Sequence, residues 1–142
     1  MQYPALITRE GGTFLIEFPD CPGCQTFARS EARIGAAAAE ALEGWLEVAL
    51  EDGVAPAPPS ARPKARKGGE IRKIRVASPL AAAIEIRWAR KGLKLSQAAL
   101  GRMIGVSQQA VAKLESGSGN VSLETLEKVA RGLNRDVEIA LV

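Results

Sequence analysis

Apolar and polar side chains alternate with a period of two over the first 18 residues, on both sides of the double glycine Gly11-Gly12. Successive side chains of a β-strand point to opposite faces, so this alternation is typical of strands that bury one face. The pattern predicts a β-hairpin that turns at the glycines and buries one partly aromatic face. The apolar positions are Tyr3, Ala5, Ile7, Phe14, Ile16 and Phe18.

The period changes to three and four residues after Ser30, which is a suitable N-cap for a long helix. Gly53 provides its end. A helix that covers one face of a small sheet gives a ββ(β)α arrangement, so we expect an α+β fold for this part of the chain. The apolar helical positions are Ile34, Ala38, Ala41, Leu42, Trp45, Leu46, Val48 and Leu50.

Residues 55–69 interrupt both periodicities with prolines, basic side chains and glycines. This composition is typical of an extended, solvated tether. We therefore expect three segments: a front domain over residues 1–54, a Pro/Lys/Arg-rich linker over 55–69, and a second domain over 70–142.

The second domain is predicted to contain a helix from Pro79 to about Lys91 and two short helices, 97–103 and 108–115, which follow the caps Ser96 and Ser107. The short helices are joined by an apolar turn at Ile104-Gly105-Val106. Two short helices joined by a glycine-centred turn are typical of an all-α helix-turn-helix domain.

Short strands are predicted at both ends of this domain, over Ile71–Val76 and at Val137, Ile139 and Leu141. Glu138 can face a basic side chain of the first strand, which favours antiparallel pairing of the two. Two strands alone are marginal, so we expect a second subunit to complete the sheet. Such a homodimer, or a higher even oligomer, would present two reading helices to operator half-sites about 34 Å apart.

Five polar side chains of the helix-turn-helix are expected to point outward: Gln97, Ser107, Gln108, Gln109 and Lys113. Glutamine and serine bond to base edges or phosphate, and lysine neutralises phosphate or reaches guanine. We predict that these five residues contact DNA.

Composition narrows the chemistry, because the chain has no histidine and two cysteines among 142 residues. Histidine-based catalysis and histidine metal ligation are therefore excluded.

The net charge of +3 is unevenly distributed along the chain: residues 1–60 carry a net charge of −6 and residues 61–142 carry a net charge of +9. The acidic helical positions Glu40, Glu43, Glu47 and Glu51 fall on one exposed stripe, which we interpret as a solvated face and not as a two-metal nuclease site.

Cys21 and Cys24 form a C-x-x-C pair. No second pair completes a zinc site, and no helix begins directly after Cys21 to lower a thiol pKa, so we interpret the pair as a structural loop. The alternatives are a redox pair and a metal site shared between molecules.

No stretch approaches the roughly 20 apolar residues that span a bilayer, and the N-terminus has no secretory signal pattern. We therefore expect a cytoplasmic protein without a membrane partner.

The second domain resembles the XRE, or lambda-repressor-like, DNA-binding family over residues 79–134. The resemblance implies that the helix from Ser107 enters the major groove, that Gln97 braces a phosphate and that Ser122 caps a supporting helix. Gly101 and Ala112 depart from the family pattern, and the glycine suggests looser helix packing. The motifs that carry the resemblance are Leu95-Ser96-Gln97-Ala98-Ala99-Leu100, Gly105-Val106-Ser107-Gln108-Gln109-Ala110-Val111, Leu114-Glu115-Ser116-Gly117 and Leu123-Glu124-Thr125-Leu126-Glu127-Lys128-Val129-Ala130.

The front domain resembles the HicB antitoxin family over residues 1–60. This resemblance implies a partial RNase H-like fold that masks a small HicA-type ribonuclease toxin, joined to a DNA-binding part that represses the operon. It implies a binding protein, with no enzymatic activity, no catalytic residue, no metal and no cofactor. Candidate toxin contacts are Glu17, Phe18, Asp20, Glu43 and Glu47. The motifs are Tyr3-Pro4-Ala5, Glu10-Gly11-Gly12-Thr13-Phe14, Glu17-Phe18-Pro19-Asp20-Cys21-Pro22-Gly23-Cys24, Thr26, Glu40-Ala41-Leu42-Glu43-Gly44-Trp45-Leu46 and Pro58-Pro59-Ser60.

Two other functions remain open at this point. The chain can be an XRE-type transcriptional regulator whose front domain senses a ligand or another partner. A nuclease with RNase H-like chemistry would require metal-dependent cleavage by the front domain.

Overall fold

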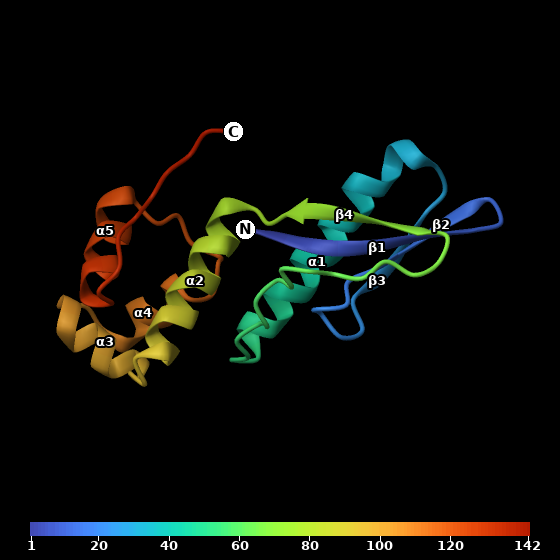
Figure 1. Ribbon diagram of the computed structural model, residues 1–142. Helices are drawn as coiled ribbons and strands as arrows, with labels where there is room; N and C mark the ends of the chain where they lie inside the picture. Colours follow the sequence, from blue (N-terminus) through green and yellow to red (C-terminus); the bar gives the residue numbers. More distant parts are fainter. The chain divides into compact units, whose positions relative to one another are not determined.

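The computed structural model describes all 142 residues and divides the chain into two compact units, Met1–Ala77 and Ser78–Val142 (Figure 1). The first unit combines a sheet with a helix and the second is helical, so the α+β fold class is confirmed. Each unit contains one of the two tryptophans, Trp45 and Trp88.

The sheet of the first unit has four antiparallel strands in the order β3-β2-β1-β4. The expected hairpin is confirmed: β1 and β2 are joined at Gly11, whose φ of 62° lies in the left-handed region that glycine adopts without steric cost. One sheet face buries Tyr3, Ala5, Ile7 and Ile16. The strands are β1 (Gln2–Glu10), β2 (Thr13–Glu17), β3 (Gln25–Ala28) and β4 (Gly69–Arg75).

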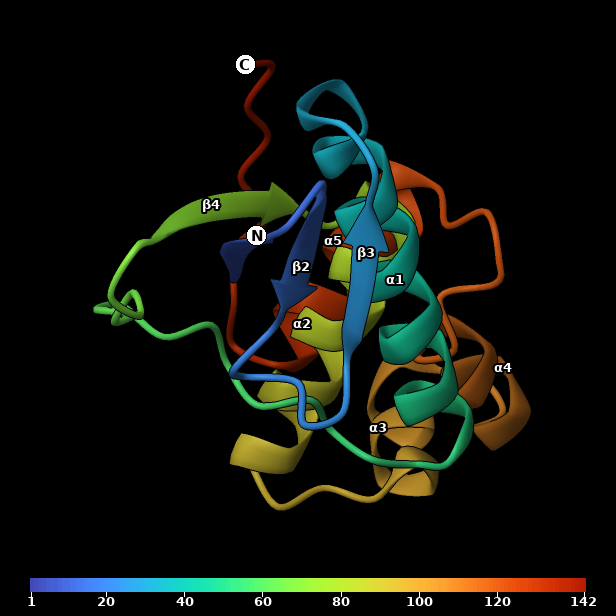
Figure 2. The same cartoon turned by 90° about the vertical axis from the view of Figure 1, so that its right-hand side faces the viewer.

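One long helix, α1 (Ile34–Glu51), lies against the sheet (Figure 2). Its buried positions recur every four residues from Ile34 through Ala38 and Leu42 to Leu46, and then after three residues at Ala49, which agrees with the predicted helical period. A short 3-10 turn, η1 (Glu31–Arg33), precedes it. Ser30 adjoins η1 and makes no side-chain capping hydrogen bond, so its predicted role as the N-cap of α1 is wrong.

The expected linker is part of the first unit, because residues 55–69 run from α1 to β4 along the same body. The Tyr3 hydroxyl donates to the Ala57 carbonyl at 2.7 Å, and the Asp20 carboxylate accepts from the N–H and the hydroxyl of Ser60. Pro56 is buried. The prediction of a tether between two domains is therefore wrong, although most of residues 55–69 are exposed as expected. Proline prevents regular structure in this loop, and its polar groups hold it to the folded unit.

The strand at Ile71–Val76 also belongs to the first unit, as β4, where it pairs with β1 from Gln2 opposite Arg75 to Thr8 opposite Gly69. Residues 135–142 contain no strand. The predicted sheet between the ends of the second domain is therefore wrong, because the hairpin offers β4 a long apolar neighbour that the short C-terminal segment does not match. The boundary lies between Ala77 and Ser78 instead of in the proline-rich segment.

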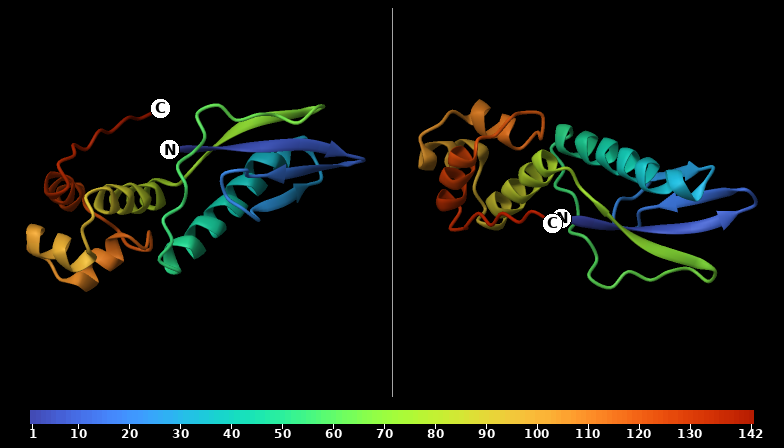
Figure 3. Two further views of the ribbon diagram at one scale, coloured as in Figure 1. Left: turned by 60° about the horizontal axis from the view of Figure 1, so that its bottom comes forward. Right: turned by 90° about the horizontal axis from the view of Figure 1, so that it is seen from above.

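The second unit contains four helices: α2 (Ser78–Gly92), α3 (Gln97–Ile104), α4 (Gln108–Leu114) and α5 (Leu123–Gly132) (Figure 3). The three helices predicted from residue 79 to residue 115 are present within one residue of their expected ends. None of the helices combines the length and the apolar composition that a transmembrane span requires. The core of this unit is made by Ile86, Leu100, Ile104, Val111, Val129 and Leu133.

Candidate nucleic-acid interface

Each short helix of the second unit begins at a serine cap. The Ser96 hydroxyl accepts from the Ala99 N–H at 3.0 Å, and the Ser107 hydroxyl accepts from the Ala110 N–H at 3.1 Å. Between the helices, Gly105 adopts φ 73°, a left-handed conformation that ends α3. Helix starts and the turn between them are therefore fixed by local sequence, as predicted.

Gly101 allows α3 to approach the start of α4 closely. A Cβ at this position would lie 2.6 Å from the Val106 carbonyl oxygen, a backbone atom that has little freedom to move. The expectation that Gly101 loosens the packing is wrong, since the missing side chain is what allows the close contact.

A buried carboxylate fixes the end of α4 relative to α2. Glu115 is fully buried, and its carboxylate oxygens lie 2.8 Å from the Nε and the Nη2 of Arg90. Arg87 Nε lies 3.3 Å from Glu115 Oε1, and Arg90 also donates to the Leu95 carbonyl at 2.7 Å. Sequence reasoning missed this cluster, although two arginines on the apolar face of α2, three residues apart, were a signal that a buried acid was needed.

The five predicted DNA contacts lie on α3, on α4 and at the cap between them. Ser107, Gln108, Gln109 and Lys113 are exposed, and Gln97 is half-buried at the first position of α3. The Ser107 oxygen is already engaged by its cap, but its O–H remains able to donate. The structure thus places three exposed polar groups at the start of α4, with a cation one turn further along.

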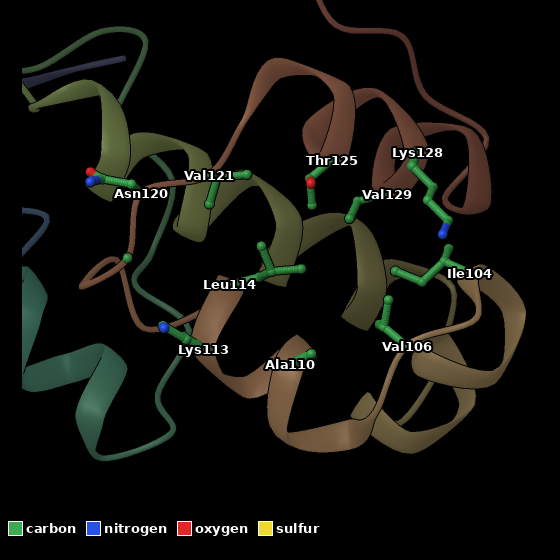
Figure 4. A pocket seen from close by; sticks show the side chains of 11 residues that line it. Ile104, Val106, Ala110, Lys113, Leu114, Asn120, Val121, Thr125, Lys128 and Val129 are labelled. Carbon is green, nitrogen blue, oxygen red and sulfur yellow. The ribbon is translucent and has the colours of Figure 1, made fainter.

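An apolar hollow of about 230 Å³ lies between α4 and α5 in the same unit, and Ile104, Leu114 and Val129 line it (Figure 4). Lys113 and Lys128 also line it, from opposite helices. The lysines give the hollow cationic edges.

These features correspond to a known family of domains: residues 86–139 match the model of the helix-turn-helix family. Residues 86–139 form a helix-turn-helix domain. In this motif the second helix enters the major groove of DNA, and here that helix is α4. The predicted helix-turn-helix is confirmed.

Two solved structures are similar to part of the chain. A chain of the "HicA3 and HicB3 toxin-antitoxin complex" is 25% identical with a TM-score of 0.42, over 54% of this chain and 99% of that one. The "Antitoxin HicB3 crystal structure" is 25% identical with a TM-score of 0.48, over 54% of this chain and 62% of that one. The sequence matches no curated protein.

The candidate toxin contacts in the first unit lie in different surroundings. Glu47 is exposed on α1, and Glu43 is half-buried there. Glu17 is partly buried and lies 3.2 Å from Arg66, while Asp20 is bonded to Ser60. Phe18 is only 3% exposed, so the structure leaves it no surface to offer a partner.

The C-x-x-C pair forms a tight loop, in which the Cys24 N–H donates to the Cys21 carbonyl at 2.9 Å. Both thiols are free and buried. Burial raises the pKa of Cys21 to about 12, with smaller contributions from Cys24 and Asp20, and it raises the pKa of Cys24 to about 11. These thiols are therefore protonated and weakly nucleophilic at neutral pH. The structure contains no group of three or more side chains able to hold a metal ion.

Proposed function

We propose that this chain is an antitoxin of a type II toxin–antitoxin system. Its first unit binds and neutralises a small HicA-type ribonuclease, and its second unit represses the chain's own operon through the helix-turn-helix. The chain acts by binding and not as an enzyme, as a dimer or higher even oligomer in the cytoplasm.

The observation that carries the toxin-binding half is the convergence of separate HicB-like motifs. Trp45, in the motif at residues 40–46, donates its indole N–H to the Pro22 carbonyl at 3.1 Å. Asp20, in the motif at residues 17–24, accepts from Ser60, at the end of the motif 58–60. Three segments that are distant in sequence thus meet in one cluster of the first unit, which favours a shared role for them.

The acidic face of α1 supplies the electrostatic part of the proposal. Glu40 and Glu47 are exposed and Glu43 is half-buried on this helix. An enzyme that cleaves RNA has a cationic surface, so an acidic stripe would steer its approach and disfavour wrong partners.

Repression is proposed to depend on the exposed side chains of α4. A glutamine amide can bond in a bidentate manner to the N6 and N7 edge of adenine, and Lys113 can reach guanine or a phosphate. Ser107 and Gln97 would hold the DNA backbone and so set the register of α4 in the groove.

The DNA-binding test replaces both Gln108 and Gln109 with Ala. Because these side chains are exposed, the fold should be unchanged, while discrimination between operator and random DNA in a gel-shift titration should be relaxed or lost. Gln25→Ala, an exposed glutamine of the first unit, is the control and should bind like the unmodified chain. Unchanged discrimination in the double variant would show that α4 is not the reading helix.

The antitoxin test co-expresses the chain with the product of an adjacent small reading frame, followed by a growth assay and a tagged pull-down. Restored growth together with a stable complex supports the proposal, and Glu43→Lys with Glu47→Lys should slow complex formation, most clearly at low salt. Absence of both toxicity and complex would leave an XRE-type regulator whose first unit senses something else.

A further inference from the structure

The last residues of the second unit make no backbone hydrogen bonds to its helices. The chain reverses after α5 at Asn134, which adopts φ 55°, a left-handed conformation that asparagine tolerates. The Arg135 N–H donates to the Ala130 carbonyl at 2.8 Å, and this is the last backbone hydrogen bond along the chain. The backbone of residues 136–142, called the tail below, therefore has unused donors and acceptors.

The tail has the side-chain pattern of a strand although it pairs with nothing. Val137, Ile139 and Leu141 alternate with Glu138 and Ala140. Ile139 is 62% exposed and Leu141 is 99% exposed. An extended segment with a free edge and one apolar face is a template for pairing with another strand.

From this placement we infer that the tails of two copies pair as antiparallel strands centred on Ile139, and that this ribbon joins the dimer. The inference rests on the dimer of the proposed function and specifies how it is held together.

Charge and apolar pairing together select the register of the two tails. Two identical antiparallel strands related by a two-fold axis place residues of equal parity opposite each other, so the apolar positions of both strands share one face in every such register. A pair centred on Glu138 would oppose two carboxylates, and one centred on Val137 would oppose Asp136 and Glu138. These like-charge pairs are destabilising.

The register centred on Ile139 avoids both like-charge pairs, and unlike a register centred on Ala140 it gives Val137 an apolar partner within the tail. It places Ile139 opposite its own copy, Val137 opposite Leu141, and Glu138 opposite Ala140. All three apolar positions of each strand then share one face. Two strands alone are marginal, so this face needs cover. Leu123 and Met103 in the same unit are 61% and 57% exposed and supply apolar surface of the required kind.

The test uses two lysine substitutions at neighbouring positions of the full chain. Ile139→Lys would place two ammonium groups face to face at the two-fold axis, and it should raise the dimer dissociation constant about tenfold or more. Ala140→Lys makes the same change in charge, but its partner is Glu138, so the dimer should be as tight or tighter. Sedimentation equilibrium measures both, and far-UV circular dichroism checks that both variants fold.

A cysteine version tests the register directly. Ile139→Cys should form a disulfide across the two-fold axis under mild oxidation, because directly opposed Cβ atoms lie at about the separation that a disulfide needs. Val137→Cys should cross-link poorly alone and efficiently when Leu141→Cys is added. The native Cys21 and Cys24 are buried and do not compete.

Three results would overturn the inference. They are a monomeric chain at the highest soluble concentration, a dimer that Ile139→Lys leaves intact, and faster self-cross-linking of Val137→Cys than of Ile139→Cys. A monomeric chain would also contradict the dimer of the proposed function, whereas the other two results contradict the tail pairing alone. None of these measurements involves DNA or toxin, so the binding of either partner is tested separately.

Discussion

At the scale of single residues, the absence of one side chain at Gly101 controls the geometry of the helix-turn-helix. Gly101→Ala forces a Cβ against the Val106 carbonyl, which lies 2.6 Å from its ideal position. We expect a loss of about 1–3 kcal/mol in the free energy of unfolding, measured by urea denaturation.

Gly92 is the matched control for this substitution. It lies at the end of α2 in the same unit, and nothing lies within 4 Å of a Cβ added there. Gly92→Ala should therefore leave stability unchanged or raise it slightly. Equal losses in the two variants would contradict the role assigned to Gly101.

The buried thiols make a second prediction at this scale. Because burial holds the pKa of Cys21 near 12 and that of Cys24 near 11, both should be alkylated slowly at pH 8 in the folded chain and rapidly in denaturant. Mass spectrometry follows both reactions. Native-state alkylation at the rate of a free thiol would show that the loop is open.

The same raised pKa values determine the direction in which stability changes with pH. The unfolded thiols ionise above about pH 9 while the folded ones keep their protons, so the thiols' contribution to stability is full below pH 9. It decreases as the pH rises toward 11–12.

At the scale of elements, the loop between α1 and β4 depends on a few polar anchors. Asp20→Ala removes the acceptor for both Ser60 hydrogen bonds. The loop should then open more often, and trypsin should cut severalfold faster after Lys64, Arg66 or Lys67.

Asp52→Ala, which changes the charge equally at an exposed position after α1, should leave the cleavage rate unchanged. Equal cleavage of both variants and the unmodified chain would mean that Asp20 does not hold the loop.

The helices were predictable because their caps and apolar periods are local signals. Ser96, Gly105 and Ser107 cap or end the helices next to which they lie in the sequence. The exposed face of α4 follows from the spacing of its apolar residues. Pairing of β4 with β1 depends on a contact across more than 60 residues, which periodicity does not contain. The burial of the Glu115 carboxylate was equally unpredictable from the sequence, because the residue lies at what resembles an ordinary helix end while its partners lie on α2.

At the scale of the whole molecule, the position of the boundary changes how the chain should be cut. A fragment of residues 1–77 retains β4 and the anchored loop, and it should fold cooperatively. A fragment of residues 1–60 loses β4 and exposes one side of β1, so it should be unfolded or aggregated. Thermal unfolding followed by circular dichroism distinguishes them, and a cooperative transition in the shorter fragment would contradict the fold described.

The position of the boundary also changes the net charge that each part of the chain carries. The first unit carries ten basic and ten acidic side chains, and the second carries nine basic and six acidic ones. The acidic front inferred from residues 1–60 is therefore balanced by the basic loop and β4 of the same unit. Net positive charge is confined to the helix-turn-helix unit, which favours association with DNA through that unit.

Trp45 and Trp88 give the molecule a built-in optical readout. One indole belongs to each unit, so Trp45→Phe leaves a chain whose fluorescence reports on the helix-turn-helix unit, and Trp88→Phe leaves one that reports on the sheet unit. Emission from these two variants can separate the melting of the units and assign a bound partner to one of them without any attached dye.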